Sequence, residues 1–373
     1  MATASPPPAS PSSANWQRIM LRNFLELLPT LLAPIFGIAA ALIIIVLILQ
    51  TQDADPKLAW DYLYQGTLES AEKRADMVAF WMPVAITSFG LVLTYNAGLW
   101  NIGVEGQIIM GAIGATWAVR VATNPTSNPY VGLDTPVQIS LMFICVMLLV
   151  AGLALLWIGD MRWITWTGLL LLGIFFFMAL RLGEVFVRDY GVHIAIASFV
   201  CAAGGGALWA TIAAVLKTRG GVNEIFGGVA LNFIAQTFNL YLVDDPWADP
   251  GGRSLETTRF PEEARLASFE QYRRLSPATI YITLGAFVLV FLIMTVSRWG
   301  LQLRAQGKNE RSAYLLGVRT ERNTILAMAL CGAMAGIAGG YRVHDQTWLR
   351  LTSSPSGGIG FLAILIVLLA SLS

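Results

Sequence analysis

The feature that most constrains the fold of this chain is a series of apolar runs, each about 17 to 25 residues long, separated by short polar segments. A run of this length can cross the hydrocarbon core of a bilayer as an α-helix. Of the 373 residues, 56% are hydrophobic and only 13% are charged, a balance that few water-soluble folds tolerate. Stretches such as AALIIIVLIL do not alternate between apolar and polar residues, which excludes a membrane barrel. The sequence therefore predicts an all-α integral membrane protein.

We predict one polytopic domain over residues 28–373, with about ten transmembrane helices, some of them broken or re-entrant. The approximate bounds of the predicted spans are 29–50, 79–98, 106–121, 138–159, 163–182, 193–216, 225–243, 279–296, 323–341 and 357 to the last residues. Residues 1–27 are rich in Pro, Ser and Ala and lack the pattern of a cleaved signal peptide. We expect them to form a disordered cytoplasmic segment before a retained first span.

The loops alternate in charge along the predicted spans. Basic residues gather in every second loop, and most of all in residues 298–322, whereas residues 54–77 and 244–277 are mixed or acidic. Because positive charge stays on the cytoplasmic side, this pattern predicts a cytoplasmic N-terminus, a cytoplasmic loop at 298–322 and an outside loop at 244–277. The net charge of +1 gives no reason to expect a nucleic-acid partner.

Residues 95–115, YNAGLWNIGVEGQIIMGAIGA, place polar side chains inside a run that otherwise reads as membrane-embedded. The glycines predict a helix that ends near Gly98 and another that starts near Asn101, whose side chain can cap free N–H groups. Two interpretations of the Glu105 carboxylate stay open at this point: it is stabilised by a helix N-terminus, or it lines a pathway or a gate. The candidate pathway residues in this segment are Asn96, Asn101, Glu105 and Gln107.

Two further patterns lie in later spans. Asn232 is about two turns inside its span, so it either faces the pathway or bonds to a neighbouring helix. Gly332, Gly336 and Gly340 recur every four residues and should let another helix approach closely.

We expect no metal site, no nucleotide site and no catalytic group in this chain. The two histidines have no carboxylate or cysteine at ligand spacing, and the three cysteines lie in apolar runs as small packing residues. The sequence contains neither a GxxxxGK[ST] loop nor a Ser/His/Asp grouping. The residues concerned are His193, His344, Cys145, Cys201 and Cys331.

Four segments in order carry a resemblance to a known family: AGLWNIGVEGQIIMGAIGA, LKTRGGVNEIFGGVALNFIA, LRAQGKNERSAYLLGVRTERNTILAMALCGAMAGIAGG and GGIGFLAILIVLLA. From about residue 79 onward, the chain resembles the permease subunit of ATP-binding-cassette (ABC) importers. This family is shared by simple-sugar, nucleoside and branched-chain amino-acid systems. The GVNEI block and the large outside loop are most similar to the nucleoside and simple-sugar branch.

The resemblance implies a bacterial inner-membrane channel that works with two cytosolic ATPase subunits, a second permease copy or homologue, and an extracytoplasmic solute-binding protein or lipoprotein. It implies that ATP binds to the partner subunits and that this chain holds no cofactor. The family's cytosolic coupling segment falls on residues 303–317, within the basic loop. The matching or basic residues that we assign to coupling are Arg304, Ala305, Gly307, Lys308, Asn309 and Gly317.

The chain departs from the family in two places. Residues 157–190 hold a very apolar extra stretch, so the span count there is the least certain. The sequence also stops inside the last apolar run, where the family normally continues, so we expect the C-terminal part of the domain to be missing.

We expect a neutral cargo, a nucleoside or a simple sugar, because the spans hold Asn and Gln but almost no unpaired charge. Alternatives are a branched-chain amino-acid permease of the same family, a gradient-driven secondary transporter with Glu105 as the coupling carboxylate, and a membrane protein with a purely structural role. With the later segments in view, the 95–115 segment is best interpreted as a broken helix at the cytoplasmic end of the pathway, with Glu105 structural or gating.

Overall fold

The computed structural model describes residues 36–52, 54–123, 193–252 and 254–371, together with scattered helical positions between 141 and 178. Its helices are Phe36–Thr51, α2 (Pro56–Thr67), α3 (Ala71–Asn96), α4 (Val104–Thr123), α7 (Ile194–Thr218), α8 (Glu224–Asp244), the 3₁₀ turn η1 (Glu262–Ala264), α9 (Pro277–Val296), α10 (Arg298–Lys308), α11 (Glu310–Leu315), α12 (Thr320–His344) and α13 (Ile359–Ser371). Within these residues there are isolated β-bridges but no strand. The all-α prediction is confirmed.

The chain divides into two compact units, residues 1–73 with the last two residues, and residues 74–371. In the first unit, helix Phe36–Thr51 and α2 meet at a bend of 119°. Asp55 begins α2 by accepting a hydrogen bond from the backbone N–H of Lys57 (2.9 Å), and Pro56 occupies the first helical position. All the features described below belong to the second unit.

Five helices in the described ranges are long and apolar enough to cross a membrane, namely α3, α7, α8, α9 and α12, and the bent pair of the first unit would make a sixth. Each of these helices overlaps one of the spans predicted from the sequence, and in the bent pair helix Phe36–Thr51 does so. The two predicted spans at 138–159 and 163–182, and the predicted disordered segment 1–27, lie outside the described residues. The count of ten therefore stays a prediction, while the multi-pass helical class is confirmed.

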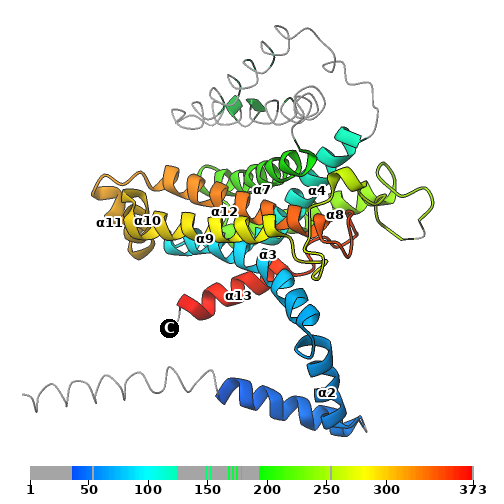
Figure 1. Cartoon of the computed structure of the whole chain (residues 1–373). Helices are drawn as coiled ribbons and strands as arrows, with labels where there is room; N and C mark the ends of the chain where they lie inside the picture. Colours follow the sequence, from blue (N-terminus) through cyan, green and yellow to red (C-terminus); the bar gives the residue numbers. More distant parts are fainter. Residues whose placement is uncertain are drawn as a thin grey trace, which may run out of the picture. The chain divides into compact units, whose positions relative to one another are not determined.

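The core of the second unit is formed where α4, α7 and α12 cross (Figure 1). At each crossing a glycine of one helix faces the backbone of another. A Cβ added to Gly111 would fall on Gly336, and one added to Gly206 would fall on the carbonyl of Gly332. Helix axes can approach this closely only where no side chain separates the backbones.

The outer helices α8 and α9 present large apolar side chains instead of burying them. Only 17% of the apolar window of α9 is buried, against 67% for α3 and for α12. Phe226, Phe233 and Tyr281 are among the most exposed side chains. Exposure of this kind suits a helix that faces lipid, where apolar surface has no cost.

Helices α10 and α11 lie together at one end of the bundle, here called the α10–α11 end (Figure 1). Ser297 starts α10 by accepting a hydrogen bond from the N–H of Gly300 (2.9 Å), and Asn309 starts α11 by accepting one from Ser312 (2.9 Å). Gly317 has a φ of +86°, which ends this short helical pair in a left-handed turn.

At the opposite end, here called the loop end, residues 245–276 pack against residues 345–358 (Figure 1). Backbone bonds join Thr257 to Leu351 (3.0 Å) and Phe260 to Leu349 (2.7 Å). Arg274 holds the buried carboxylate of Asp345 at 2.9 Å. Burial alone would raise the pKa of Asp345, but the bonds from Arg274 and from the N–H of Thr347 outweigh burial and hold it below its ordinary value.

Candidate functional site

The break between α3 and α4 is built around Gly98. Gly98 has a φ of +75°, and its N–H donates to the carbonyl of Tyr95 (2.9 Å). The N–H of Leu99 donates to the carbonyl of Thr94 (2.9 Å). This is the closing turn of a helix that ends in a left-handed residue, a conformation that glycine adopts without strain. The sequence-based prediction of a helix end near Gly98 agrees with this geometry.

Asn101 and Gln107 bond to each other across the break. The Asn101 amide donates to Gln107 Oε1 (3.1 Å), and the Gln107 amide donates to Asn101 Oδ1 (2.9 Å). Asn101 also donates to Cys331 Sγ (3.2 Å) on α12. Both amides are buried, and their pairing satisfies polar groups that would otherwise be costly inside a membrane.

The location of Cys331 gives the depth of this pair. Cys331 follows the first residue of α12, Thr320, by about 16 Å of helix, close to halfway along it. The break therefore starts at the α10–α11 end, where Gly98 contacts Gly307, and by Asn101 has reached the middle of the bundle. The prediction that this segment lies at the cytoplasmic end of the pathway stays a prediction, since the geometry relates it only to the α10–α11 end.

Asn232 of α8 fastens the start of α4. Its Oδ1 accepts from the N–H of Gly106 (2.7 Å), and its Nδ2 donates to the carbonyl of Ile102 (2.9 Å). A Cβ on Gly228 would lie 2.7 Å from the nitrogen of Gly103, so α8 touches the break backbone directly. Of the two roles left open for Asn232, the geometry places it in a bond to a neighbouring segment.

Glu105 joins two helix starts. It lies in the first turn of α4, and its carboxylate accepts from the backbone N–H of Gly358 (Oε1, 3.1 Å) and of Gly360 (Oε2, 2.8 Å) at the start of α13. The side chain is only 7% exposed. A carboxylate is favoured here because both helix N-termini present free N–H groups and positive dipole ends.

Four of the five predicted pathway residues therefore meet around residues 102–107, namely Asn101, Glu105, Gln107 and Asn232. Asn96 does not join them, because its amide donates to the carbonyl of Val92 in its own helix (2.8 Å).

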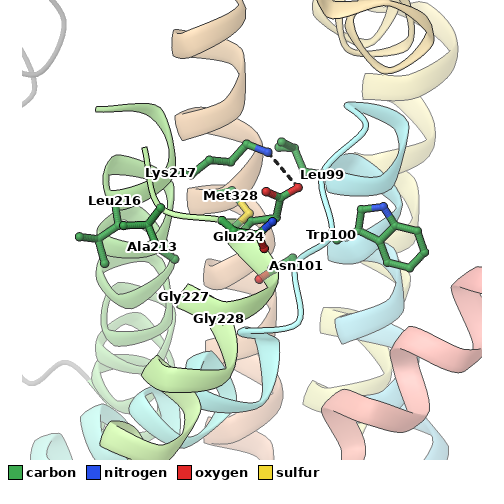
Figure 2. Close-up of a pocket in the computed structure, with 12 residues that line it drawn as sticks. Leu99, Trp100, Asn101, Ala213, Leu216, Lys217, Glu224, Gly227, Gly228 and Met328 are labelled. Carbon is green, nitrogen blue, oxygen red and sulfur yellow. Dashed lines mark ion pairs between the residues drawn. The ribbon is translucent and has the colours of Figure 1, made fainter. Parts of the chain in front are cut away.

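A small hollow opens beside this cluster, between the break and the turn that joins α7 to α8 (Figure 2). Lys217 reaches across it to Glu224 at 2.9 Å, and Asn223 caps α8 through the N–H of Ile225 (2.9 Å). Trp100, Asn101 and the glycines of α8 are also on its walls. The charges of the hollow are thus paired with each other, leaving a mainly apolar lining.

Sequence reasoning missed the segment 345–358 as a part of this site. It runs from the loop end along α8, where Gln236 donates to the carbonyl of Ser353 (2.7 Å) and Asn239 to that of Thr352 (3.0 Å), and then reaches Glu105 at Gly358. The signal in the sequence was the Gly357–Gly358 pair, both with positive φ, directly before an apolar helix. From the sequence alone, this pair indicates only the start of a span.

The predicted coupling segment contacts the break. A Cβ on Gly307 would fall on the carbonyl of Asn96 and lie 3.0 Å from the nitrogen of Gly98, and Leu303 and Leu99 belong to the same buried hydrophobic cluster. Arg304 and Lys308 are exposed on α10. Asn309 caps α11, Gly317 ends it, and Ala305 accepts the closing bond of α10.

The helix-packing glycines also have defined neighbours. Gly332 faces the carbonyl of Gly206, and Gly336 faces that of Ala202, so both meet backbone. Gly340 instead meets side chains, because a Cβ added to it would lie 2.9 Å from the Cβ of Ala202. In the described ranges, no group of three or more His, Cys, Asp or Glu residues could hold a metal ion.

Comparison with known proteins gives one family and several relatives. A family model described as branched-chain amino acid transport system / permease component matches residues 135–373. The chain is 26% identical to the glucose ABC transporter permease protein TsgB13 of Haloferax volcanii, over 90% of this chain and 73% of the relative. It is 23% identical to the guanosine ABC transporter permease protein NupP of Bacillus subtilis, over 94% and 81%.

A third relative, the nucleoside ABC transporter permease protein NupB of Lactococcus lactis, is 20% identical over 91% of this chain and 77% of its own length. No solved structure matches the chain. Together with the broken helix and the apolar spans, the family match establishes that this chain is a multi-pass membrane protein of the ABC transporter permease family known as the branched-chain amino acid transport system permease component.

Proposed function

We propose that this chain is the membrane-spanning permease subunit of an ATP-driven importer that carries a nucleoside or a simple sugar. The cargo class is supported by the relatives, which are named for glucose, guanosine and nucleosides. It is also supported by the charges around the break: Glu105 is bonded to two backbone N–H groups, and Lys217 is paired with Glu224. A neutral cargo needs no free charge to balance it.

In this proposal ATP binds and is hydrolysed on two partner subunits, and this chain holds no cofactor and performs no chemistry. The N-terminus and the α10–α11 end face the cytoplasm, a second permease copy or homologue completes the pathway, and an extracytoplasmic solute-binding protein delivers cargo to the loop end. These assignments follow the charge pattern of the loops and the family membership.

The observation that carries the proposal is the contact between α10 and the break. Next to α10, the last two residues of the short α11 and its C-cap residue expose three apolar side chains in a row, Tyr314 (68%), Leu315 (77%) and Leu316 (84%). An apolar tip outside the membrane is a docking surface rather than a stable free surface. In this proposal, a partner that displaces α11 also displaces the adjoining α10, whose Gly307 contacts Gly98 at the start of the break.

The test uses the complex purified through a tag on this chain and reconstituted in liposomes, with guanosine and glucose as radiolabelled probes. We expect ATP-dependent uptake of one probe that survives collapse of the membrane potential and stops when the ATPase is inactivated. Uptake by this chain alone, driven by a gradient and abolished by Glu105→Gln, would establish the secondary-transporter alternative instead.

The docking surface is tested separately by the double variant Arg304→Glu, Lys308→Glu. Reversing two exposed charges on α10 should uncouple ATP hydrolysis from uptake, because the ATPase would no longer seat on this face. The control is Gly285→Ala in α9, which lies on neither proposed docking surface and where a new Cβ meets nothing within 4 Å. Normal transport by the α10 variant contradicts the docking assignment.

A further inference from the structure

The segment 345–358 gives α13 a start deep inside the bundle rather than at its edge. Asp345 is bound at the loop end by Arg274, whereas Gly358, further along the same segment, bonds to Glu105 at the start of α4. Glu105 in turn lies two residues before Gln107, which pairs with Asn101 near the middle of α12. Two helices, α4 and α13, thus begin next to each other in the interior.

The side chain of Glu105 holds these two helix starts together, and the absence of a side chain at Gly360 leaves room for it. The carboxylate of Glu105 takes one backbone N–H on each oxygen. Gly360 allows the approach, since a Cβ at that position would fall on Glu105 Oε2 and lie 3.0 Å from its Cα and its backbone nitrogen. Without the carboxylate, two positive helix ends would face each other in a medium that screens them poorly.

The same contact is linked to the α10–α11 end by a short chain of packed groups. Gly307 of α10 touches Gly98, the break runs from Gly98 to Glu105, and Glu105 holds α13. Any displacement of α10 that moves the break must therefore move Glu105 or release α13. Hydrogen bonds to a carboxylate switch between made and broken states, which suits a two-state element.

We propose that Glu105 is a clasp that keeps the starts of α4 and α13 together in the resting state, and that its release is a step of the transport cycle. Glu105 is a positioning residue here, because it acts through the position of α13 rather than by touching cargo or carrying a proton. The role in the cycle rests on the proposed function, whereas the clasp contact itself does not.

The first test measures hydrogen–deuterium exchange of the peptide around Gly358 and Gly360, with this chain alone in lipid nanodiscs. Glu105→Gln keeps the side-chain shape but turns an NH₂ group toward one N–H donor, so exchange in this peptide should rise roughly 10-fold or more. Peptides from α12 should not change. Unchanged exchange around Gly360 would overturn the clasp.

Gly360→Ala provides a second route to the same state, since it keeps the carboxylate but pushes α13 away from it. It should raise exchange in the same peptide even if Glu105→Gln fails to fold. The matched controls are Gly285→Ala in α9, where a Cβ meets nothing within 4 Å, and Glu263→Gln in the exposed part of the loop end. Neither control should alter exchange around Gly360.

The second test measures ATP hydrolysis by the purified complex without cargo or binding protein. If the clasp stabilises the resting state, Glu105→Gln and Gly360→Ala should raise this basal rate roughly 10-fold and lower the cargo moved per ATP. A residue with only a structural role would lower the yield of complex without raising its basal rate. Raised hydrogen–deuterium exchange with an unchanged basal rate of ATP hydrolysis would overturn the role of Glu105 in the cycle. If no ATPase subunit purifies with this chain, the proposed function is refuted, while the exchange result stays valid.

Discussion

The crossing of α7 and α12 makes a quantitative prediction about a single methyl group. In Gly336→Ala the new Cβ would fall on the carbonyl oxygen of Ala202 and lie 2.9 Å from its carbon and 3.2 Å from the Cα of Gly206. All three atoms belong to the backbone of α7, which cannot rotate away as a flexible side chain does. The two helices must therefore separate along the whole seam.

The expected cost follows from a comparison with Gly285→Ala in α9. Both substitutions replace a helical glycine by alanine, which by itself favours the helix by roughly 1 kcal/mol. At Gly285 nothing lies within 4 Å of the new methyl, so only this gain applies. At Gly336 overpacking adds a cost of about 1–3 kcal/mol. The two variants should therefore differ by about that amount, roughly 5- to 150-fold in the unfolding equilibrium.

The assay is unfolding of the purified chain in mixed micelles with increasing dodecyl sulfate, followed by circular dichroism. Gly336→Ala should unfold at a lower dodecyl sulfate fraction than Gly285→Ala, which should unfold at the same fraction as the wild type or at a higher one. Equal midpoints for the two variants would refute the inference that α7 and α12 are in backbone contact at this glycine.

Two further predictions concern buried polar groups. Asn232→Leu leaves the N–H of Gly106 and the carbonyl of Ile102 without partners, so it should destabilise the chain in the same assay by roughly 1–3 kcal/mol; a smaller change would show that the break does not depend on α8. Arg274 holds the pKa of Asp345 in the folded chain below its ordinary value of 3.8, so this ion pair stabilises the fold above pH 3.8. The stabilisation is lost as the pH falls through the pKa that Asp345 has in the folded chain. Asp345→Asn should therefore flatten the acid limb of a stability-against-pH curve, and an unchanged limb would contradict the ion-pair assignment.

The class of the fold follows from local properties of the sequence. A run of apolar residues must satisfy its own backbone bonds in lipid, so it forms a helix whatever its neighbours do. The same holds for the end of α3, because a glycine with a φ of +75° ends a helix by its own backbone preference. The family could also be identified from ordered short segments, since they are contiguous in the chain.

The partners of the polar residues depend on contacts between distant parts of the chain. Asn232 and Gly106 are 126 positions apart, and Glu105 and Gly360 are 255 apart. Nothing in the sequence around Glu105 distinguishes a carboxylate that caps a second helix from one that carries a proton. Only the return of residues 345–358 into the bundle shows that this carboxylate accepts from two backbone N–H groups at the start of α13.

The sequence by itself thus determined a helical membrane protein with a broken helix near Gly98, because length, hydropathy and glycine act locally. The tertiary structure alone decided that Gly336 meets the backbone of α7 and that Glu105 joins α4 to α13. The physical reason is that a buried polar group or a glycine gains its role from the atoms it meets, and those atoms lie in segments far away in the chain.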